Sequence, residues 1–348
     1  MTPGLACQIG DRHSDRPVPP AMGLERTNKH VRPSAMVQFD GLHSVRLEAG
    51  VLSIGWVVTV LGVALERADH VVLACSVVFR VSRQRAQRRL PETSVASPAR
   101  VASSARLLLL AVPDCELAGL VSGVAATSVV RPGMIVAYTS GANGGTILAQ
   151  LGEDSCIPLG IHPAMTFTGS DEDLSRLPDT SFGITTTDEV GVGYAIAQSL
   201  VLEMGGQLFC VVKDARILCH AILDHVDNHI VTVFADALEA LRVVLRGSEL
   251  LELGVLPACG GEVVDDQFGN TAELIFGPLA RAACENTAQR GQAALTRLVD
   301  RGDADAVAGH LVALMRIGPE LAQAYRVNAL RAAQCAHAPD DVVEAVAP

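Results

Sequence analysis

The chain has 348 residues, 49% of them hydrophobic, and a mean hydropathy of +0.32, so most of it should fold around buried cores, with two domains as the natural expectation. The formal net charge of −11 and the lack of a basic stripe argue against nucleic acid as a partner. The longest apolar run, Val51 to Leu65, contains polar residues and is shorter than the roughly 20 residues of a membrane span, so we expect no membrane association.

The N-terminal segment, residues 1–45, mixes proline, glycine and charges without periodicity. This pattern predicts a disordered extension or a start assigned too far upstream. No basic segment followed by an apolar one opens the chain, and nine cysteines are scattered without a Cys-x-x-Cys pair. We therefore expect a cytoplasmic protein with free thiols and no metal site.

Between residues 46 and 213, short apolar runs alternate with helical patterns. Near-continuous apolar strands that alternate with helices are typical of a mostly parallel sheet covered on both faces. The sequence therefore predicts an α/β, Rossmann-type domain over 46–213. Its predicted strands are Val51–Ile54, Val71–Cys75, Leu107–Val112, Ile135–Tyr138, Pro158–Ile161, Phe182–Ile184 and Phe209–Val212.

After Asp214 the strand pattern stops. Apolar residues then recur at helical spacing for about seven turns, and three further helical patterns follow. Residues 214–340 are predicted to form an all-helical domain for substrate binding or dimerisation, broken by a loop at 256–269.

The stretch Val51 to Ser76 has the outline of a βαβ nucleotide-binding unit, whose turn normally reads G-x-G-x-x-G. Only the middle glycine is kept, as Gly55, and it is the one that lets the backbone approach a pyrophosphate. Ser53 takes the first position, and Val58 takes the third, where overpacking would cost about 1–3 kcal/mol. The candidate cofactor residues of this turn are Ser53, Gly55, Trp56 and Val57.

Beyond the second predicted strand, Ser76 is followed by Arg80, Ser82 and Arg83. An NAD site would have a carboxylate near this point for the ribose hydroxyls. Arginines suit a 2′-phosphate instead, which predicts NADP in preference to NAD. The alternative is a surface turn with ordinary arginines.

Two further loops follow apolar strands and are candidates to border the nicotinamide. One is Val112-Pro113-Asp114, although Asp114 could equally be a helix N-cap. The other is Ser140-Gly141, which could meet nicotinamide or substrate.

Several motifs together resemble a two-domain reductase-like family with an N-terminal Rossmann domain and a C-terminal helical domain of unknown function. Its relatives include 6-phosphogluconate dehydrogenase, ketopantoate reductase and pyrroline-5-carboxylate reductase. The resemblance covers about residues 50–337 and implies an NADP-linked oxidoreductase fold without implying a substrate. It is carried by AVPD (111–114), TSGANG (139–144), HPAMTF (162–167), RxLxHA (216–221), Asn228, ENTxxRGQAALT (285–296), RGD (301–303) and His310.

The chain departs from the family pattern where its members bind cofactor or do chemistry. Trp56 stands where the family usually has arginine, Cys219 replaces a tyrosine, and Arg297-Leu298 replace Gly-Pro. Related dehydrogenases also place a lysine four residues before the asparagine on the first long helix of the second domain, where this chain has Asp224 before Asn228. These changes bear on activity more than on fold.

Hydride transfer to C=O or C=N needs a proton donor and groups that orient the acceptor. We expect His220 to be the donor, Asn228 to orient the acceptor and His162 to bond the substrate, although either histidine could simply pack against a neighbour. The candidate substrate residues are Pro163, Thr166, Asn286 and Thr296.

Two other chemistries are disfavoured. His225 and His229 have metal-pair spacing, but HVDNH lacks the glutamate of HExxH. TSGANG lacks a G-x-S-x-G nucleophile elbow.

The sequence therefore predicts an NADP-dependent reductase of a small carbonyl or imine compound, with a ketopantoate-like 2-keto acid as one guess. One alternative is a non-catalytic binding or scaffold protein with an eroded cofactor site, and another is a decayed gene product of marginal stability. From the related reductases we also expect a homodimer through the helical domain.

Overall fold

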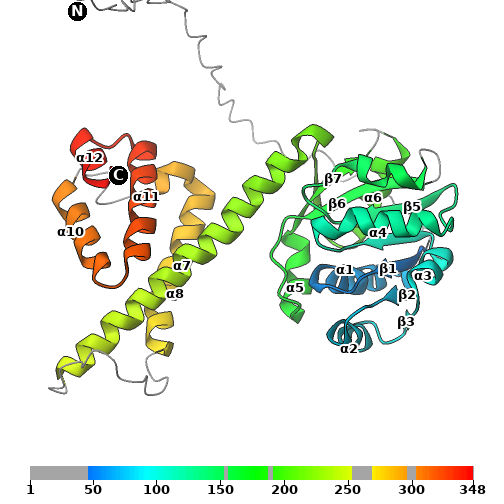
Figure 1. The fold of residues 1–348 in the computed structure, drawn as a ribbon, viewed down its shortest axis with the longest axis horizontal. Helices are drawn as coiled ribbons and strands as arrows, with labels where there is room; N and C mark the ends of the chain where they lie inside the picture. Colours follow the sequence, from blue (N-terminus) through cyan, green and yellow to red (C-terminus); the bar gives the residue numbers. More distant parts are fainter. Residues whose placement is uncertain (1–45, 153–155, 187–190, 253–268, 296–302, 348) are drawn as a thin grey trace, which may run out of the picture. The chain divides into compact units, whose positions relative to one another are not determined.

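The computed structural model describes residues 46–152, 156–186, 191–252, 269–295 and 303–347 (Figure 1). The predicted extension at residues 1–45 and nearly all of the predicted loop at 256–269 lie outside these ranges, so both stay predictions. Among the described residues, no helix is both long and apolar enough to cross a membrane.

An eight-stranded sheet dominates the first part of the chain, in the order β3-β2-β1-β4-β5-β6-β7-β8. The first six strands run parallel, β7 is antiparallel to β6, and β8 is parallel to β7. The mostly parallel Rossmann-type sheet is thus confirmed. The strands are β1 (Glu48–Leu52), β2 (Val71–Ser76), β3 (Ser94–Val95), β4 (Leu107–Leu110), β5 (Met134–Tyr138), β6 (Cys156–Pro163), β7 (Ser181–Thr186) and β8 (Gln207–Cys210).

All seven predicted strands are present, because each carries an apolar run. The strand that sequence reasoning missed is β3, whose two residues give no periodic signal. The end of the last predicted strand is also corrected, since β8 stops at Cys210 and Val211 and Val212 lead into the next helix.

Two layers of helices cover the sheet (Figure 1). Strand β4 has apolar side chains on both faces, and each face needs a helical layer to bury it. Leu107 and Leu109 pack in the core cluster that contains residues of α1 and α6. Leu108 and Leu110 pack in the cluster that contains residues of α3 and α4. The helices of this part are α1 (Trp56–Arg67), α2 (Arg80–Arg89), α3 (Pro98–Ser104), α4 (Asp114–Ala126), α5 (Asp171–Arg176) and α6 (Val192–Glu203).

The strand order places β1 beside β4, with the chain going on to β2 on one side and β5 on the other. This is the topological switch point of a doubly wound sheet, where ligands bind beyond the carboxyl ends of the strands. The segments that leave β1 and β4 there are residues 53–55 and 111–113.

The second part of the chain is helical, as predicted. It begins with a short 3₁₀ turn, η3 (Lys213–Ala215), and the 37-residue α7 (Arg216–Glu252). A small core of Val307, Leu311, Ala329 and Val346 joins the last helices. The helices after α7 are α8 (Gly269–Arg290), α10 (Ala304–Met315), α11 (Pro319–Ala336) and α12 (Asp340–Val346). The division into domains at residues 46–213 and 214–340 stays a prediction.

Candidate functional site

The turn after β1 has the backbone of a nucleotide-binding turn despite its missing glycines. Ser53 adopts φ +75°, the left-handed conformation usually given to glycine, and its N–H donates to Ser76 O over 3.1 Å. A Cβ at Gly55 would meet no atom within 4 Å, so space is open beside the first turn of α1. No side chain caps α1 at this end. Open space and uncapped N–H groups fit a diphosphate here.

Val58, at the third fingerprint position, is fully buried in the core cluster of α1 and α6. Its isopropyl group therefore lies among core side chains and does not occupy the open space beside Gly55. Val57 is partly buried and packs against the same cluster.

Trp56, the first residue of α1, is 46% exposed and contacts two other segments. The guanidinium of Arg85 lies 3.5 Å from the centre of its ring, and Arg85 also donates to Ile54 O over 2.9 Å. Gly169 lies so close that a Cβ there would overlap the ring. The residue that replaces the usual arginine therefore joins the turn to α2 and to the loop before α5.

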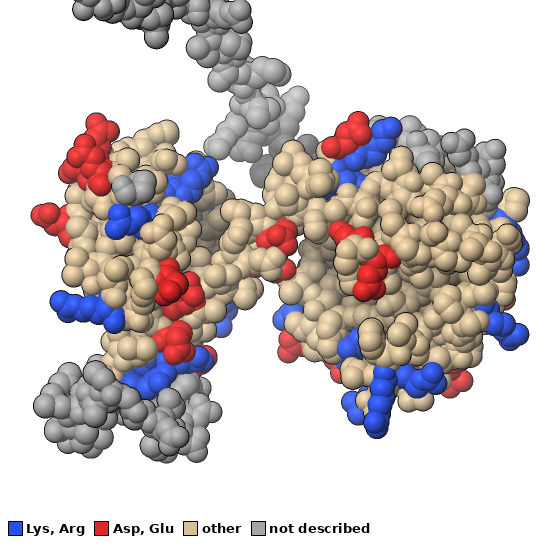
Figure 2. Space-filling view, in the orientation of Figure 1, with Lys and Arg blue, Asp and Glu red and all other residues tan. Residues whose placement is uncertain are grey.

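The end of β2 carries unpaired positive charge. Ser76 is the last residue of β2, and Arg80 is the first of α2. Within the described residues, the exposed side chains of Arg80 and Arg83 form no ion pair, and Ser82 lies between them on the same helix. In Figure 2, basic side chains gather where Figure 1 places α2. An anionic group beyond β2 would meet two unpaired arginines.

The predicted loop beyond β4 leads straight into α4. Val112 is followed by Pro113 as the N-cap residue, and Asp114 is the first helical residue. Asp114 is therefore not the N-cap itself, but its carboxylate lies in the favourable first turn. Asp114 also interacts electrostatically with His162 and Arg216, so this loop faces the residues described next.

His162, near the carboxyl end of β6, meets Gly141, which follows β5, and His220 of α7. The two imidazole rings stand edge to face, with centres 5.6 Å apart. Gly141 packs so tightly between them that a Cβ there would overlap the His220 ring and lie 2.9 Å from His162 Cε1. Ser140 is buried, and its hydroxyl accepts from the Asn143 N–H over 2.9 Å. The Ser140-Gly141 loop is thus fixed against both histidines.

His162 has a defined hydrogen-bonding role. Its Nδ1 lies 3.0 Å from Thr139 O, and since a carbonyl oxygen only accepts, Nδ1 carries the proton. Burial lowers the pKa of His162 below its usual value. The ring is therefore neutral at pH 7, with Nε2 available as an acceptor.

Arg216, the first residue of α7, is 2% exposed and tied to the sheet. It donates to the Thr185 hydroxyl over 2.7 Å and to Ser140 O. Its guanidinium lies 5.5 Å from the centre of the Tyr138 ring, and the Tyr138 hydroxyl and Arg216 Nε find no hydrogen-bond partner in the part of the chain that the structure describes. Arg216 therefore fixes the start of α7 against the Ser140 loop and so sets the place of His220, one turn further on.

A cavity of about 350 Å³ opens between this loop region and α7. His162 and His220 line it together with Asp224 and Asp227, two carboxylates on the same face of α7. Asp227 accepts a hydrogen bond from the Thr166 hydroxyl, which links α7 to the loop after β6. The remaining lining residues are Pro163, Ala164, Met165, Leu223 and Val226.

Asn228 does not line this cavity. Its side-chain amide donates to Asp224 over 2.6 Å, so it would act on a substrate only through that carboxylate. Asn286 is exposed on α8 and is not among the residues that line the cavity, and Thr296 lies outside the described residues, so its role stays a prediction. The structure thus brings together His162, Pro163, Thr166 and His220, and leaves Asn228 and Asn286 outside the lining.

The His225–His229 pair is exposed, with the two Nδ1 atoms 2.8 Å apart. In the described ranges, no group of three or more His, Cys, Asp or Glu residues is arranged to hold a metal.

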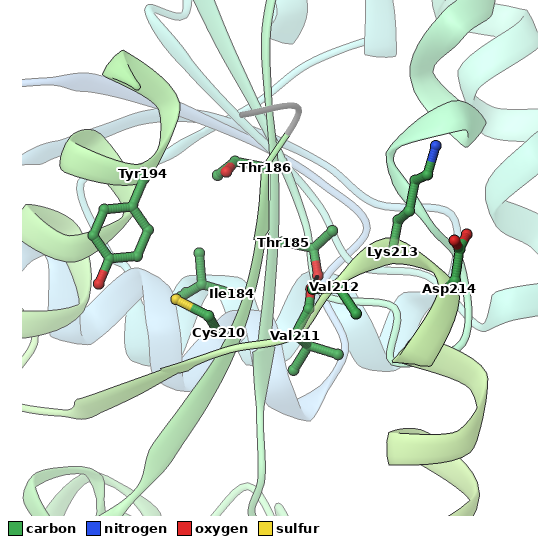
Figure 3. A pocket seen from close by; sticks show the side chains of 9 residues that line it. All are labelled: Ile184, Thr185, Thr186, Tyr194, Cys210, Val211, Val212, Lys213 and Asp214. Atoms are coloured by element: carbon green, nitrogen blue, oxygen red, sulfur yellow. Dashed lines mark hydrogen bonds between the residues drawn. The ribbon is translucent and has the colours of Figure 1, made fainter. Parts of the chain in front are cut away.

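A second cavity, of about 310 Å³, lies at the carboxyl ends of β7 and β8 (Figure 3). Tyr194 of α6 and Cys210 of β8 lie on one side of the strands, and Lys213 and Asp214 of η3 on the other. The carboxyl ends of β7 and β8 point the opposite way to that of β6, but Thr185 of this cavity accepts from the same Arg216 guanidinium that bonds Ser140 O.

Sequence reasoning missed four residues that the site brings together: Arg85, Arg216, Asp224 and Asp227. Three of them could have been found from their spacing in the sequence. Residues 216, 220, 224 and 227 are spaced by four, four and three, which places them on one face of a helix. No sequence pattern pointed to Arg85, because its partner Trp56 lies on another helix.

Comparison with known proteins agrees with this fold. Residues 32–163 match the model of a Rossmann-like domain, and residues 180–332 match a domain of unknown function, DUF2520. The chain thus combines a Rossmann-like domain with a DUF2520 helical domain, as the motifs indicated. No curated protein matches the chain.

Solved structures share the whole architecture at low identity. A Bacteroides fragilis protein named as an NADP oxidoreductase has 16% identity and a TM-score of 0.62 over 83% of this chain and 98% of its own. A Pseudomonas putida protein named as an oxidoreductase has 13% identity and a TM-score of 0.54, over 87% and 98%. A reductive aminase from Aspergillus terreus, solved with NADPH4, cyclohexanone and allyl amine, has 12% identity and a TM-score of 0.50, over 86% and 99%. These likenesses establish the fold alone.

Proposed function

We propose that the protein is an NADP-dependent reductase of a small carbonyl or imine substrate. The observation that carries this proposal is the arrangement of three features beyond the carboxyl ends of the parallel strands. They are the open turn at Gly55, the unpaired arginines after β2, and the cavity lined by His162 and His220. That edge is where doubly wound sheets bind dinucleotides.

The residues present fit NADP(H) in three places. The uncapped start of α1 beside Gly55 would hold the diphosphate. Arg80 and Arg83 would bind the 2′-phosphate through charge-assisted hydrogen bonds. The Ser140-Gly141 loop would border the nicotinamide, next to both histidines. When bound, the reduced cofactor supplies the hydride.

The chain's own residues would supply orientation and the proton. His162, neutral and with Nδ1 used on Thr139 O, offers only an acceptor at Nε2. His220 is then the histidine that can give a proton to the reduced oxygen or nitrogen. Arg216 would hold His220 in register with the Ser140 loop.

A turnover assay tests this proposal. NADPH oxidation is followed with a panel of small ketones, 2-keto acids and cyclic imines, for the wild type and His220→Gln. We expect turnover of at least one compound, and a fall of about 100-fold or more in kcat for the variant with unchanged NADPH affinity, since general acid catalysis contributes that much. Equal rates would remove His220 as the donor.

The second candidate is a non-catalytic binding or scaffold protein. It is favoured by Trp56 in the place of an arginine and Asp224 in the place of a lysine, both at positions where related enzymes bind or react. A folded protein that binds neither NADPH nor NADH at millimolar concentration would support this candidate and contradict the first.

We also propose that the protein forms a homodimer through its helical part. Ile222, Val226 and Ile230 repeat every four residues along α7, and all three are exposed in the single chain. Sedimentation of the full chain should give a dimer, and Ile230→Glu should weaken it. A wild-type monomer at micromolar concentration would contradict this.

A further inference from the structure

We infer that the cavity beside His162 and His220 selects a substrate with a positively charged nitrogen, an iminium, over a carboxylate such as the 2-keto acid considered from the sequence. This inference rests on the proposed function for its setting and deepens it by naming the substrate class. It depends on the charges and hydrogen-bonding groups that line the cavity.

The cavity is rich in acceptors. Asp224 and Asp227 both line it, and each has one described hydrogen-bond donor, from Asn228 and Thr166 respectively. A carboxylate offers about four lone-pair sites, so both keep acceptor capacity. His162 adds a neutral ring whose unprotonated nitrogen is Nε2. A substrate that donates N–H groups would complement this lining.

Lysine and arginine are missing from the same lining. None of the ten residues that line the cavity is either of them, and within the described residues neither Asp224 nor Asp227 forms an ion pair. Arg216, which interacts electrostatically with His162, donates its hydrogen bonds to the Thr185 hydroxyl and Ser140 O. Recognition of a substrate carboxylate usually relies on an arginine fork or a lysine. A 2-keto acid would instead face two carboxylates.

Binding of three small ring compounds to the full chain, with and without NADPH, tests the inference. Pyrrolidine is a cation at pH 7.5, cyclopentanol is neutral and cyclopentanecarboxylate is an anion. Because none of them has a ketone, aldehyde or imine group that NADPH could reduce, calorimetry measures their binding independently of catalysis. A protein that binds pyrrolidine but oxidises no NADPH would contradict the reductase proposal and leave this inference standing.

We expect pyrrolidine to bind about tenfold or more tightly than cyclopentanecarboxylate. The double variant Asp224→Asn, Asp227→Asn should lose about tenfold in pyrrolidine affinity and leave cyclopentanol unchanged. Asp236→Asn, also on α7 but away from the cavity, is the matched control and should behave as wild type. The inference is overturned if the anion binds as tightly as the cation, if the double variant keeps full pyrrolidine affinity, or if pyrrolidine does not bind at millimolar concentration.

Discussion

The indole ring of Trp56 packs directly against Gly169 and occupies the space where a Cβ of residue 169 would lie. Gly169 also has φ +79°, a conformation that other residues adopt at a cost. The Asp173 carboxylate accepts from the Gly169 N–H over 2.6 Å and so fixes this loop. The exposed tryptophan at the start of α1 is thus a structural part of the fold.

Gly169→Ala should therefore destabilise the protein through two separable effects. The left-handed backbone costs about 1–2 kcal/mol with a Cβ, and the overlap with the indole adds about 1–3 kcal/mol. Denaturant unfolding of Gly169→Ala in the wild type and in Trp56→Ala separates them. In the Trp56→Ala background, Gly169→Ala should cost only the backbone strain, because no indole ring is left for the new methyl group to overlap. Equal losses in both would show that the ring does not occupy this space.

Ser53→Gly should stabilise the protein. Ser53 holds φ +75°, so removing its Cβ relieves about 1 kcal/mol of backbone strain. Thermal unfolding should show a rise in Tm of about 2–4 °C. Ser128→Gly, at φ +52° beyond α4, is a control that should stabilise the protein without changing the turn after β1. A Tm that falls for Ser53→Gly would mean that the hydroxyl has an essential role at the turn.

Gly55→Ala should separate stability from cofactor binding. The residue has φ −84°, and its Cβ would point into open space, so the change in unfolding free energy should stay below about 1 kcal/mol. The new methyl group would lie where the diphosphate is proposed to approach the backbone. NADPH affinity should therefore fall about tenfold or more. An unchanged affinity would place the diphosphate elsewhere.

Much of the fold could be predicted because the strands of a parallel sheet are buried on both faces and read as apolar runs. Leu107–Leu110, all four buried, is the plainest case. Strand β3 escaped because two residues cannot show a period.

The site could be predicted only in part, because side-chain direction depends on tertiary packing. Asn228 was expected to meet the substrate, but its amide is bonded to Asp224, and it is this carboxylate that lines the cavity. Trp56 was predicted as a cofactor residue, whereas its contacts with Arg85 and Gly169 follow from the fold and could not be predicted from neighbouring sequence.

Arg80→Gln with Arg83→Gln should reduce affinity for NADPH and leave that for NADH unchanged. Each charge-assisted hydrogen bond to the 2′-phosphate contributes about 1.5–3 kcal/mol, so the double variant should lose about 100-fold or more. Arg88→Gln, exposed near the end of the same helix, serves as the control and should retain both affinities. A parallel loss for both nucleotides would assign these arginines to something other than the 2′-phosphate.

His162 should make stability depend on pH in the acidic range. Its folded-state pKa is lowered by burial, so the unfolded chain binds the proton more tightly. This contribution is fully present above the ordinary histidine pKa of about 6.5 and is lost as the pH falls from there towards the lower folded-state pKa. The difference in unfolding free energy between the wild type and His162→Gln should be constant above pH 6.5, and as the pH falls below 6.5 the wild type should lose stability relative to the variant. Parallel curves would show that His162 does not titrate differently on folding.

Calorimetric titration of the full chain with NADPH and NADH tests the central claim most directly. If the turn at Gly55 and the arginines beyond β2 form a dinucleotide site, NADPH will bind with micromolar affinity and NADH about tenfold or more weakly. Absence of NADPH binding at millimolar concentration, from a chain that unfolds cooperatively, would contradict that claim.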